Sequence, residues 1–442
     1  MPARGVVRSG RAFLGRALDS PPGQLRLAGA VLAALVLLFG AVTAWQVGTR
    51  ASAAGQVASS SGPLSQDAAE IYRSLADADT TAASGFLLAG NEPAAVRQRY
   101  QDDLTTAARL LAQAAARASS SAEAQRWIAE LNQQLPQYAG LVETARANDR
   151  QGLPLGGAYL RYASALMQDT MLPNAQRLVS AESAQLDQDY GRAESAPWAA
   201  FALGLLALAA LGAYQLRLFR RTNRVFSPGL VGATAALLAA LVWLLGGGLA
   251  AGDSLAESRT AGAEPLRALD DARTEALQAH AAENLNLVDR GSSDTYTTRW
   301  SEVTGALGGA AAGAKGPAEG SLARAERLAP RDAAGSVTEA RKQFATWSDR
   351  HKQAADKEAA GDYDAALQGT VGAGKNDTAE AAFAALEQQL GQAATVERAR
   401  FKAAADGVDG GLEVLAAGAA VLAVLSAAGV VRGIGRRLAD YR

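Results

Sequence analysis

The 442-residue chain contains no cysteine, only 13 prolines and only two histidines, and 6 % of its residues are aromatic. The lack of cysteine excludes disulfide bonds and thiolate metal sites. Alanine supplies much of the 49 % hydrophobic content, and because alanine is the strongest helix former, long helices are expected. Runs of β-branched and aromatic residues with a period of two, which would indicate strands, are scarce. The composition therefore predicts an all-α protein.

Patterns typical of catalytic sites are also scarce. His280 has Glu283 three residues further on, but no second histidine stands nearby in the sequence, so we interpret the two as an ordinary surface pair. The stretch GAGKND (372–377) has a lysine after glycine but lacks the GxxxxGK[ST] frame of a phosphate-binding loop. We therefore predict no catalytic residue, no cofactor and no metal, and expect neither enzymatic activity nor a nucleic-acid partner.

Four apolar runs are long enough to cross a hydrocarbon core of about 30 Å at about 1.5 Å per residue. They cover residues 27–47, 198–216, 230–251 and 412–431. Ala51-Ser52-Ala53 resembles a signal-peptidase site, but the run before it is longer than a usual signal segment. We interpret the glycines in and beside these runs as close helix contacts in the bilayer: Gly232, Gly246, Gly247, Gly248 and Gly418.

Arginines outside the runs indicate how the spans are oriented. They gather in three short segments: Arg4, Arg8, Arg11, Arg16 and Arg26; Arg217, Arg220, Arg221 and Arg224; and Arg432, Arg436, Arg437 and Arg442. Only Asp19 and Asp440 oppose them there. By the positive-inside rule both termini and the middle loop are cytoplasmic, in a cell membrane. These basic segments set topology and contact anionic lipids, or they dock an acidic cytoplasmic partner.

This orientation divides the chain into nine parts. They are a basic cytoplasmic N-terminus (1–26), span one (27–47), a first outside segment (48–197), span two (198–216), a basic cytoplasmic loop (217–229), span three (230–251), a second outside segment (252–411), span four (412–431) and a cytoplasmic tail (432–442). The cytoplasmic parts are too short to bury a catalytic core.

Each outside segment has the pattern of a four-helix bundle that continues into its spans. In the first, Ile71, Leu75, Ala82 and Phe86 recur at helical spacing, so Asp77 and Thr80 fall off the apolar face. Ser59–Pro63 should interrupt the helix, and further helices are expected at about 93–118, 122–147 and from about 155 into span two. The second segment repeats this plan, with helices at about 252–290, 332–360 and from 378 into span four. We interpret the chain as a tandem repeat.

Two groups of polar residues are candidate sites. The turn at 90–93 and the loop at 148–157 should lie together at the membrane-distal tip, where loops on a rigid scaffold favour partner docking. The candidates there are Asn91, Glu92, Asn148, Asp149, Arg150 and Gln151. Asp77, Thr80 and Thr81 of the first helix could meet Arg161 of the fourth inside the bundle, most simply as a structural salt bridge, because buried charges need partners.

Four stretches resemble a known family: LADADTTAASGFLLAG (75–90), RQRYQDDLTTAARLL (97–111), LVETARANDRQGLPLGGAYLRYASALM (141–167) and AAGDYDAAL (359–367). They are similar to the actinobacterial four-span membrane protein that accompanies protein kinase G. The resemblance implies amino-acid sensing through an extracytoplasmic glutamine-binding-type lipoprotein and relay to a soluble Ser/Thr kinase. It carries no catalytic residue. More loosely, each bundle is similar to the four-helix sensory domains of chemoreceptors.

The sequence thus predicts a multi-pass sensor or adaptor for signal transduction. Its partners would be a solute-binding lipoprotein outside, a Ser/Thr protein kinase inside, membrane lipids and, since an amphipathic bundle can complete itself across a dimer, a second copy of the chain. A cell-envelope scaffold without signalling is the alternative, and a transporter component is a further one. Transport usually needs charged or broken segments inside the spans, which these runs lack.

Overall fold

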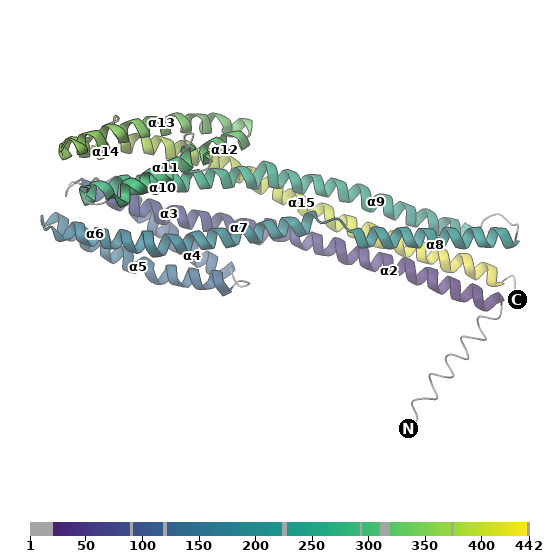
Figure 1. The fold of residues 1–442 in the computed structure, drawn as a ribbon. Helices are drawn as coiled ribbons and strands as arrows, with labels where there is room; N and C mark the ends of the chain where they lie inside the picture. The colour runs from purple at the N-terminus through teal and green to yellow at the C-terminus, as the bar shows by residue number, and fades with distance from the viewer. Residues whose placement is uncertain are drawn as a thin grey trace, which may run out of the picture. The chain divides into compact units, whose positions relative to one another are not determined.

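The computed structural model describes residues 21–88, 92–117, 122–222, 228–291, 294–309, 319–372 and 375–439. Within these ranges the regular structure is helical without a strand, which confirms the predicted all-α fold (Figure 1). The elements, with η marking π-helical turns, are α2 (Pro21–Gln56), η1 (Val57–Ser61), α3 (Gly62–Leu87), α4 (Ala94–Arg117), α5 (Ala122–Arg150), α6 (Leu155–Leu166), η2 (Met167–Met171), α7 (Leu172–Glu194), α8 (Trp198–Thr222), α9 (Pro228–Ser258), η3 (Arg259–Ala263), α10 (Glu264–Asp289), α11 (Thr295–Gly308), α12 (Ser321–Leu328), α13 (Arg331–Ala359), α14 (Tyr363–Val371) and α15 (Ala379–Ala439).

The chain folds into two compact units. One, here the membrane unit, takes residues 1–55, 190–256 and 406–442. The other, here the bundle unit, takes residues 56–189 and 257–405. Most of both predicted outside segments therefore lies in a single compact body, in which helices from the two segments pack against each other.

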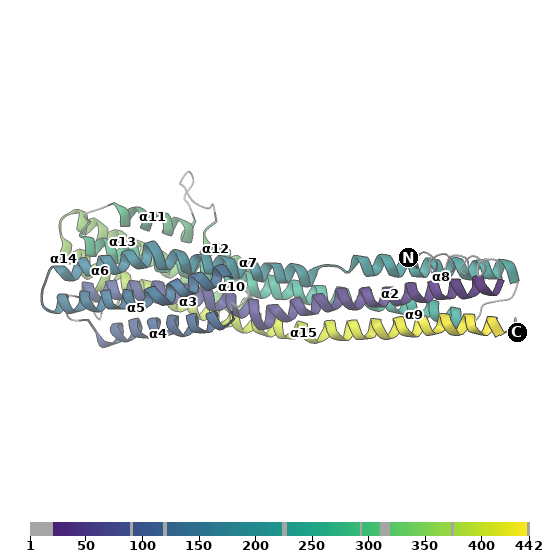
Figure 2. The ribbon, with the colours of Figure 1, turned by 90° about the horizontal axis from the view of Figure 1, so that it is seen from below.

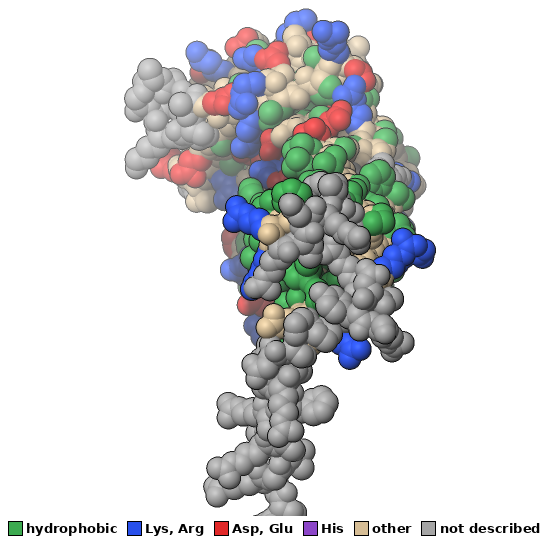
Figure 3. All heavy atoms as spheres, turned by 90° about the vertical axis from the view of Figure 1, so that its right-hand side faces the viewer, with side chains coloured by type: hydrophobic (Ala, Val, Ile, Leu, Met, Phe, Trp, Pro, Cys, Tyr) green, Lys and Arg blue, Asp and Glu red, His purple; other side chains and the backbone are tan. Residues whose placement is uncertain are grey.

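The membrane unit contains the apolar parts of α2, α8, α9 and α15. Four helices of the described chain are long and apolar enough to cross a membrane by length and composition. Val36, Phe39 and Leu237 are buried among them, whereas Val242 and Val421 are exposed, as expected of side chains that face lipid. Figure 3 views the molecule from the right-hand side of Figure 1 and shows hydrophobic side chains gathered there, with lysine and arginine at the margin.

Small residues allow the closest helix contacts in this unit. A Cβ atom at Gly229 would lie 2.6 Å from the Cα atom of Gly433, and one at Gly418 would lie 2.6 Å from Nε1 of Trp243. Of the glycines predicted at contacts, Gly418 and Gly247 lie against neighbouring side chains. Three do not, because no heavy atom of another helix approaches within 4 Å of Gly232 or Gly246, and Gly248 meets only Arg50 at that distance.

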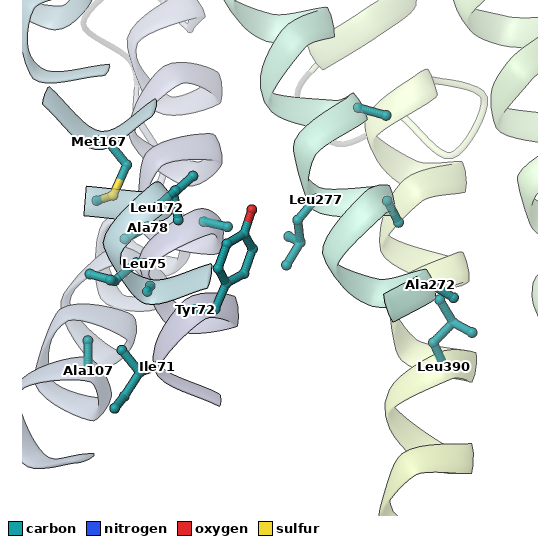
Figure 4. Close-up of a cluster of buried hydrophobic side chains, with 14 of the residues drawn as sticks. Ile71, Tyr72, Leu75, Ala78, Ala107, Met167, Leu172, Ala272, Leu277 and Leu390 are labelled. Carbon is teal, nitrogen blue, oxygen red and sulfur yellow. The ribbon is translucent and has the colours of Figure 1, made fainter. Parts of the chain in front are cut away.

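The bundle unit is built around α3 and α10, which lie side by side at its centre (Figures 1 and 2). The helix α3 also packs against α4, and α10 against α11 and α12. In Figure 4 the Tyr72 side chain of α3 extends toward the part of α10 that carries Leu277. Every residue from Ser74 to Gly85 is buried as a result. The side of α3 that carries Asp77 and Thr80 is therefore buried as well, because α4 and α10 both pack against α3.

The three π-helical turns share a sequence feature. Pro63, Pro173 and Pro265 each stand two residues after the end of η1, η2 and η3. Proline inside a helix removes one N–H donor and its ring clashes with the carbonyl group four residues back. A π turn widens the hydrogen-bond ladder to i→i+5, as shown by the Gly62 N–H that donates to Val57 O. The predicted interruption at Ser59–Pro63 is wrong for this reason, since the helix continues through a π turn.

Other predicted boundaries were close for the long helices and poor elsewhere. The helices α4, α5, α13 and α15 begin and end near the expected residues. The fourth helix does not run unbroken into span two, because Ser195–Pro197 separate α7 from α8. The short helices α12 and α14 were not predicted; Asp362 caps α14 by accepting from the Ala365 N–H at 3.1 Å.

Candidate functional site

Three segments meet at one end of the bundle unit: the last turn of α3, the start of α4 and the α5–α6 connection. A Cβ atom at Gly156 would lie 3.2 Å from the Phe86 ring of α3. Arg146 of α5 forms an ion pair with Glu92 at 2.8 Å, and its guanidinium lies 4.3 Å from the centre of the Tyr100 ring. We call this end the tip. The structure thus brings the described part of the 90–93 turn, residues 92–93, close to the 148–157 connection.

The polar residues predicted to dock a partner at the tip have mostly structural contacts. The Glu92 side chain is 8 % exposed and is held by Arg97 and Arg146. Asn148 and Gln151 donate their amide groups to the Thr144 and Ala147 carbonyls at 2.8 and 3.2 Å, which satisfies the last carbonyls of α5.

The remaining tip candidates are Asp149, Arg150 and Asn91. The backbone carbonyl of Asp149 accepts a hydrogen bond from the Gly152 N–H at 2.8 Å, in a turn where Gly152 has φ of 67°. Arg150 is exposed, whereas Asn91 lies outside the described residues.

The predicted buried salt bridge exists, but with a different partner. The Asp77 carboxylate is buried and receives both ends of the Arg99 guanidinium at 2.8 to 3.1 Å. Arg161, predicted to meet it, is exposed on α6. Thr80 donates to the Ala76 carbonyl at 2.8 Å, and Thr81 is buried beside it. Asp77 meets Arg99 and not Arg161 because α3 packs closely on α4, the helix that carries Arg99.

A second carboxylate of α4 lies close to this pair. Asp103 is 8 % exposed, and burial together with the nearby Asp77 charge raises its pKa to about 8, although Arg73 and Arg99 act against the shift. Two carboxyl groups that share a site resist ionising together. The raised pKa of Asp103 therefore favours its neutral form beside the Asp77 carboxylate.

Asp79 stands two residues after Asp77, about half a helical turn away, and its hydrogen-bond partners in the described chain are all uncharged donors. Ser164 and Gln168 of the α6–η2 segment donate to it at 2.9 Å each, and the Tyr138 hydroxyl of α5 donates at 3.3 Å. Burial raises the Asp79 pKa, and these three donors act in the opposite direction. We call this group the Asp79 cluster.

Contacts between the two segments also run through α3. Arg398 of α15 pairs with Glu70 at 3.0 Å, and Gln278 of α10 donates to the Tyr72 hydroxyl. Burial opposes ionisation of Glu70, but the hydrogen bond from Arg73 and the charges of Arg73 and Arg398 prevail and lower its pKa to about 2. The central helix of the first segment is thus tied to the second by charge as well as by packing.

The second segment holds its own buried polar group, and it contains both histidines of the chain. Glu283 of α10 contacts His280 Nδ1 at 3.1 Å and His351 Nδ1 at 2.9 Å, and accepts from Trp347 Nε1 at 2.9 Å. His280 Nε2 also contacts Glu380 of α15 at 2.8 Å. The exposed fractions of His280 and Glu283 are 1 % and 3 %. The predicted surface pair is therefore wrong, because α13 and α15 cover it. We call this group the Glu283 cluster.

Aromatic rings enclose the Glu283 cluster. The His280 ring stacks on Phe383 with centroids 3.9 Å apart, and the His351 ring stacks on Trp300 at 3.6 Å. Burial disfavours the His280 cation, but Glu380 and Glu283 prevail and raise its pKa to about 9. Burial likewise opposes ionisation of Glu283, yet the two histidines lower its pKa to about 2. Both ring nitrogens of His280 are engaged, and among the described residues no group of side chains is arranged to hold a metal ion.

Sequence reasoning missed a set of exposed apolar residues near the tip. Outside the membrane unit, the large hydrophobic side chains exposed in the described chain are Leu153, Leu155, Tyr159 and Tyr162, at 43, 57, 38 and 74 %. The signal was present in the sequence: Leu155, Tyr159 and Tyr162 follow i, i+4, i+7 spacing beside a second stripe of Gly156, Leu160 and Ala163 that forms the core.

The basic loop between spans two and three is described only in part. Arg217 and Arg220 are exposed at the end of α8. Nothing is described of the Arg221 side chain, and Arg224 lies outside the described residues. The docking or lipid-contact role of these four arginines stays a prediction.

The described chain has four helices suited to crossing a membrane, and it has a separate helical body with buried polar clusters. These two features are typical of a multi-pass membrane protein with a bundle domain. Residues 53–191 match the family model of the actinobacterial sensor domain. The matched range includes α3 to α6, the tip and the Asp79 cluster. Together these findings fit an actinobacterial membrane sensor. Comparison with curated proteins finds no match, and comparison with solved structures finds none.

Proposed function

We propose that the protein is a non-enzymatic relay that receives an extracytoplasmic amino-acid signal and alters a cytoplasmic Ser/Thr kinase. The observation that carries this proposal is the sensor-domain match over residues 53–191, in a chain with four helices able to span a membrane. An amino-acid-loaded solute-binding lipoprotein would contact the tip. The resemblance of residues 75–90 and 141–167 to the family that accompanies protein kinase G supports these two partners.

The relay would act through helices that continue from the spans into the bundle. The helices α2 and α3 are joined through η1, and α9 and α10 through η3, so each pair forms one helical run. Small sliding or tilting of packed helices is an established way to switch a protein. The partner must bind the two states with unequal affinity for any signal to pass. The arginines at 217–224 would then change their availability to the kinase.

Topology is tested first, and the absence of cysteine makes the chain suitable for single-cysteine labelling. We expect Gln151→Cys to react with a membrane-impermeant maleimide in intact cells and Arg220→Cys to react only after lysis. Both positions are exposed, so accessibility within the fold does not confound the result. The reverse pattern would reject the proposed orientation.

The relay itself is tested by cross-linking in intact cells, followed by mass spectrometry of the purified protein. We expect links from 92 or 148–157 to a solute-binding lipoprotein and from 217–224 to a soluble kinase, with at least one yield changing when glutamate or aspartate is added. Links confined to cell-wall or division proteins, without a response to amino acids, would support the scaffold alternative and reject the relay. Robust solute flux in liposomes would support a transporter.

A further inference from the structure

The exposed apolar residues near the tip form a defined surface. Leu155, Tyr159 and Tyr162 lie on one face of α6, and Leu153 stands in the connection that leads into it. We call these four residues the α6 stripe. The neighbouring face of α6 packs into the core, since Leu160 and Ala163 are 1 % and 0 % exposed. The helix therefore already has a buried apolar face, and its packing does not require the apolar residues of the stripe.

Two arginines stand close to the stripe in the sequence, Arg150 before Leu153 and Arg161 between Tyr159 and Tyr162. Arg150 and Arg161 are both exposed, and neither forms an ion pair with a carboxylate of the described chain. A Cβ atom at Gly157 would lie 3.6 Å from Nη1 of Arg161, which places that guanidinium along the tip-side half of α6. The arginines nearest to them behave differently, since Arg146 and Arg97 are both paired with Glu92. The surface thus combines two exposed tyrosines with two arginines that form no ion pair in the described chain, and tyrosine and arginine are residue types enriched at protein interfaces.

We propose that the α6 stripe is the docking surface for a folded protein whose contact face has an apolar centre and carboxylates at its rim. This inference rests on the proposed function and names the chemistry of the partner and its place of contact. Tyr162 would enter an apolar pocket of the partner, and Arg150 and Arg161 would meet the carboxylates. Tyrosine and arginine supply most of the binding free energy in such contacts when water is excluded around them.

A second copy of the chain fits this surface less well. A two-fold contact uses the same patch on both copies. The α6 stripe contains no carboxylate, so a second copy centred on it would bring no opposite charge from the stripe to Arg150 and Arg161.

The first test uses a photo-reactive benzoylphenylalanine at position 162 of the full-length protein in its own cells. Position 101 on α4 is exposed and serves as the matched control. We expect a protein adduct from position 162 that position 101 does not give, with mass spectrometry identifying the captured protein. An adduct only to a second copy of the chain, only to lipid, or equal at both positions would overturn the proposal.

The second test measures the Kd between the captured protein, after purification, and the full-length chain in nanodiscs of uncharged lipid. We expect Arg150→Glu with Arg161→Glu, or Tyr162→Ala alone, to raise Kd by about tenfold or more. The control pair Arg109→Glu with Arg126→Glu is also exposed and should change Kd by less than about twofold. Equal effects of the two pairs would reject charge-specific docking. If docking holds but the kinase does not respond to amino acids, the relay fails and the docking surface stands.

Discussion

The Asp79 cluster and the Glu283 cluster show two solutions to the same problem. Each is centred on a buried carboxylate of the first long helix of its segment, and α3 and α10 pack against each other. Asp79 is bound by a serine, a glutamine and a tyrosine, which are uncharged donors. Glu283 is bound by two histidines and a tryptophan, with Glu380 completing an alternating chain of charges.

The two clusters differ in how the buried charge is balanced. Burial raises the pKa of Asp79, whose three donors are uncharged and act against that shift. A closed network of opposite charges keeps its members ionised and costs more to open. The first segment also carries the α6 stripe and the sensor-domain match.

The largest expected effect is that of Glu283→Ala. Removing this acceptor leaves Trp347 Nε1 and His351 Nδ1 without their buried partner, so the free energy of unfolding should fall by about 3–5 kcal/mol. Chemical unfolding of the full-length protein followed by tryptophan fluorescence measures the loss. Glu339→Ala, which removes an exposed pair with Lys342, should change stability by less than about 0.5 kcal/mol. A similar small change for both variants would contradict a structural role for the cluster.

Asp79→Ala should have the next largest effect. It leaves the donors of Ser164, Gln168 and Tyr138 unsatisfied, which should cost about 2–3 kcal/mol. Asp79→Asn keeps one acceptor oxygen without the buried charge, and we expect it to cost only about 1 kcal/mol. The two variants are compared by thermal unfolding at one pH. Equal losses would mean that the charge, rather than the acceptor, holds the cluster.

Alkaline pH should loosen the Glu283 cluster. The pKa of His280 is raised to about 9, so its contribution to stability is complete below its ordinary pKa of about 6.5 and is lost as the pH rises through about 9. The groups facing His280 are Glu283 and Asn284 of α10, Glu380 and Phe383 of α15, and Trp347 of α13. We expect a loss of about 2 kcal/mol between pH 6.5 and 9.5.

Tryptophan fluorescence should report this change, because the Trp347 ring lies 5.8 Å from that of His280. His280→Gln is the control and should flatten the profile. An unchanged slope in that variant would assign the pH dependence to other groups.

The smallest effect, and the only stabilising one, is expected for Glu397→Gln. Glu397 of α15 is fully buried, and neither carboxylate oxygen has a hydrogen-bond partner in the described chain, unlike Asp79 and Glu283. Burial raises its pKa to about 7, so its contribution is complete below about 4.5 and is lost as the pH rises through 7. Glutamine should raise stability at pH 8 by about 1 kcal/mol and have less effect at pH 4.5. Thermal unfolding at the two pH values measures the difference, and a destabilised variant at pH 8 would refute the assignment.

The sequence predicted long helices and spans well, because those depend on local composition and hydropathy over windows of about 20 residues. It predicted that Asp77 would meet Arg161 and not Arg99, because periodicity describes one helix at a time and does not reveal that α4 packs on α3 beside Asp77. The meeting of His280 with His351 was missed for a related reason: 71 positions separate them, and only the packing of α13 on α10 joins them through Glu283. Docking by the polar loop residues of the tip stays a prediction, and the exposed Tyr159 and Tyr162 were overlooked because the prediction considered the loops and not the helix that follows them.

The π turns have a consequence for how the gene can change. A π turn is a helix that has accepted one extra residue, and each residue of an α-helix advances the chain by about 100°. Deleting one residue from 57–61 or 259–263 would restore an ordinary helix and turn every later side chain of that helix to a new face. Natural insertions and deletions should therefore be excluded from these two windows unless they come in compensating pairs. Length variation would collect instead in the connections at 151–154 and 360–362, where no helix register has to be kept.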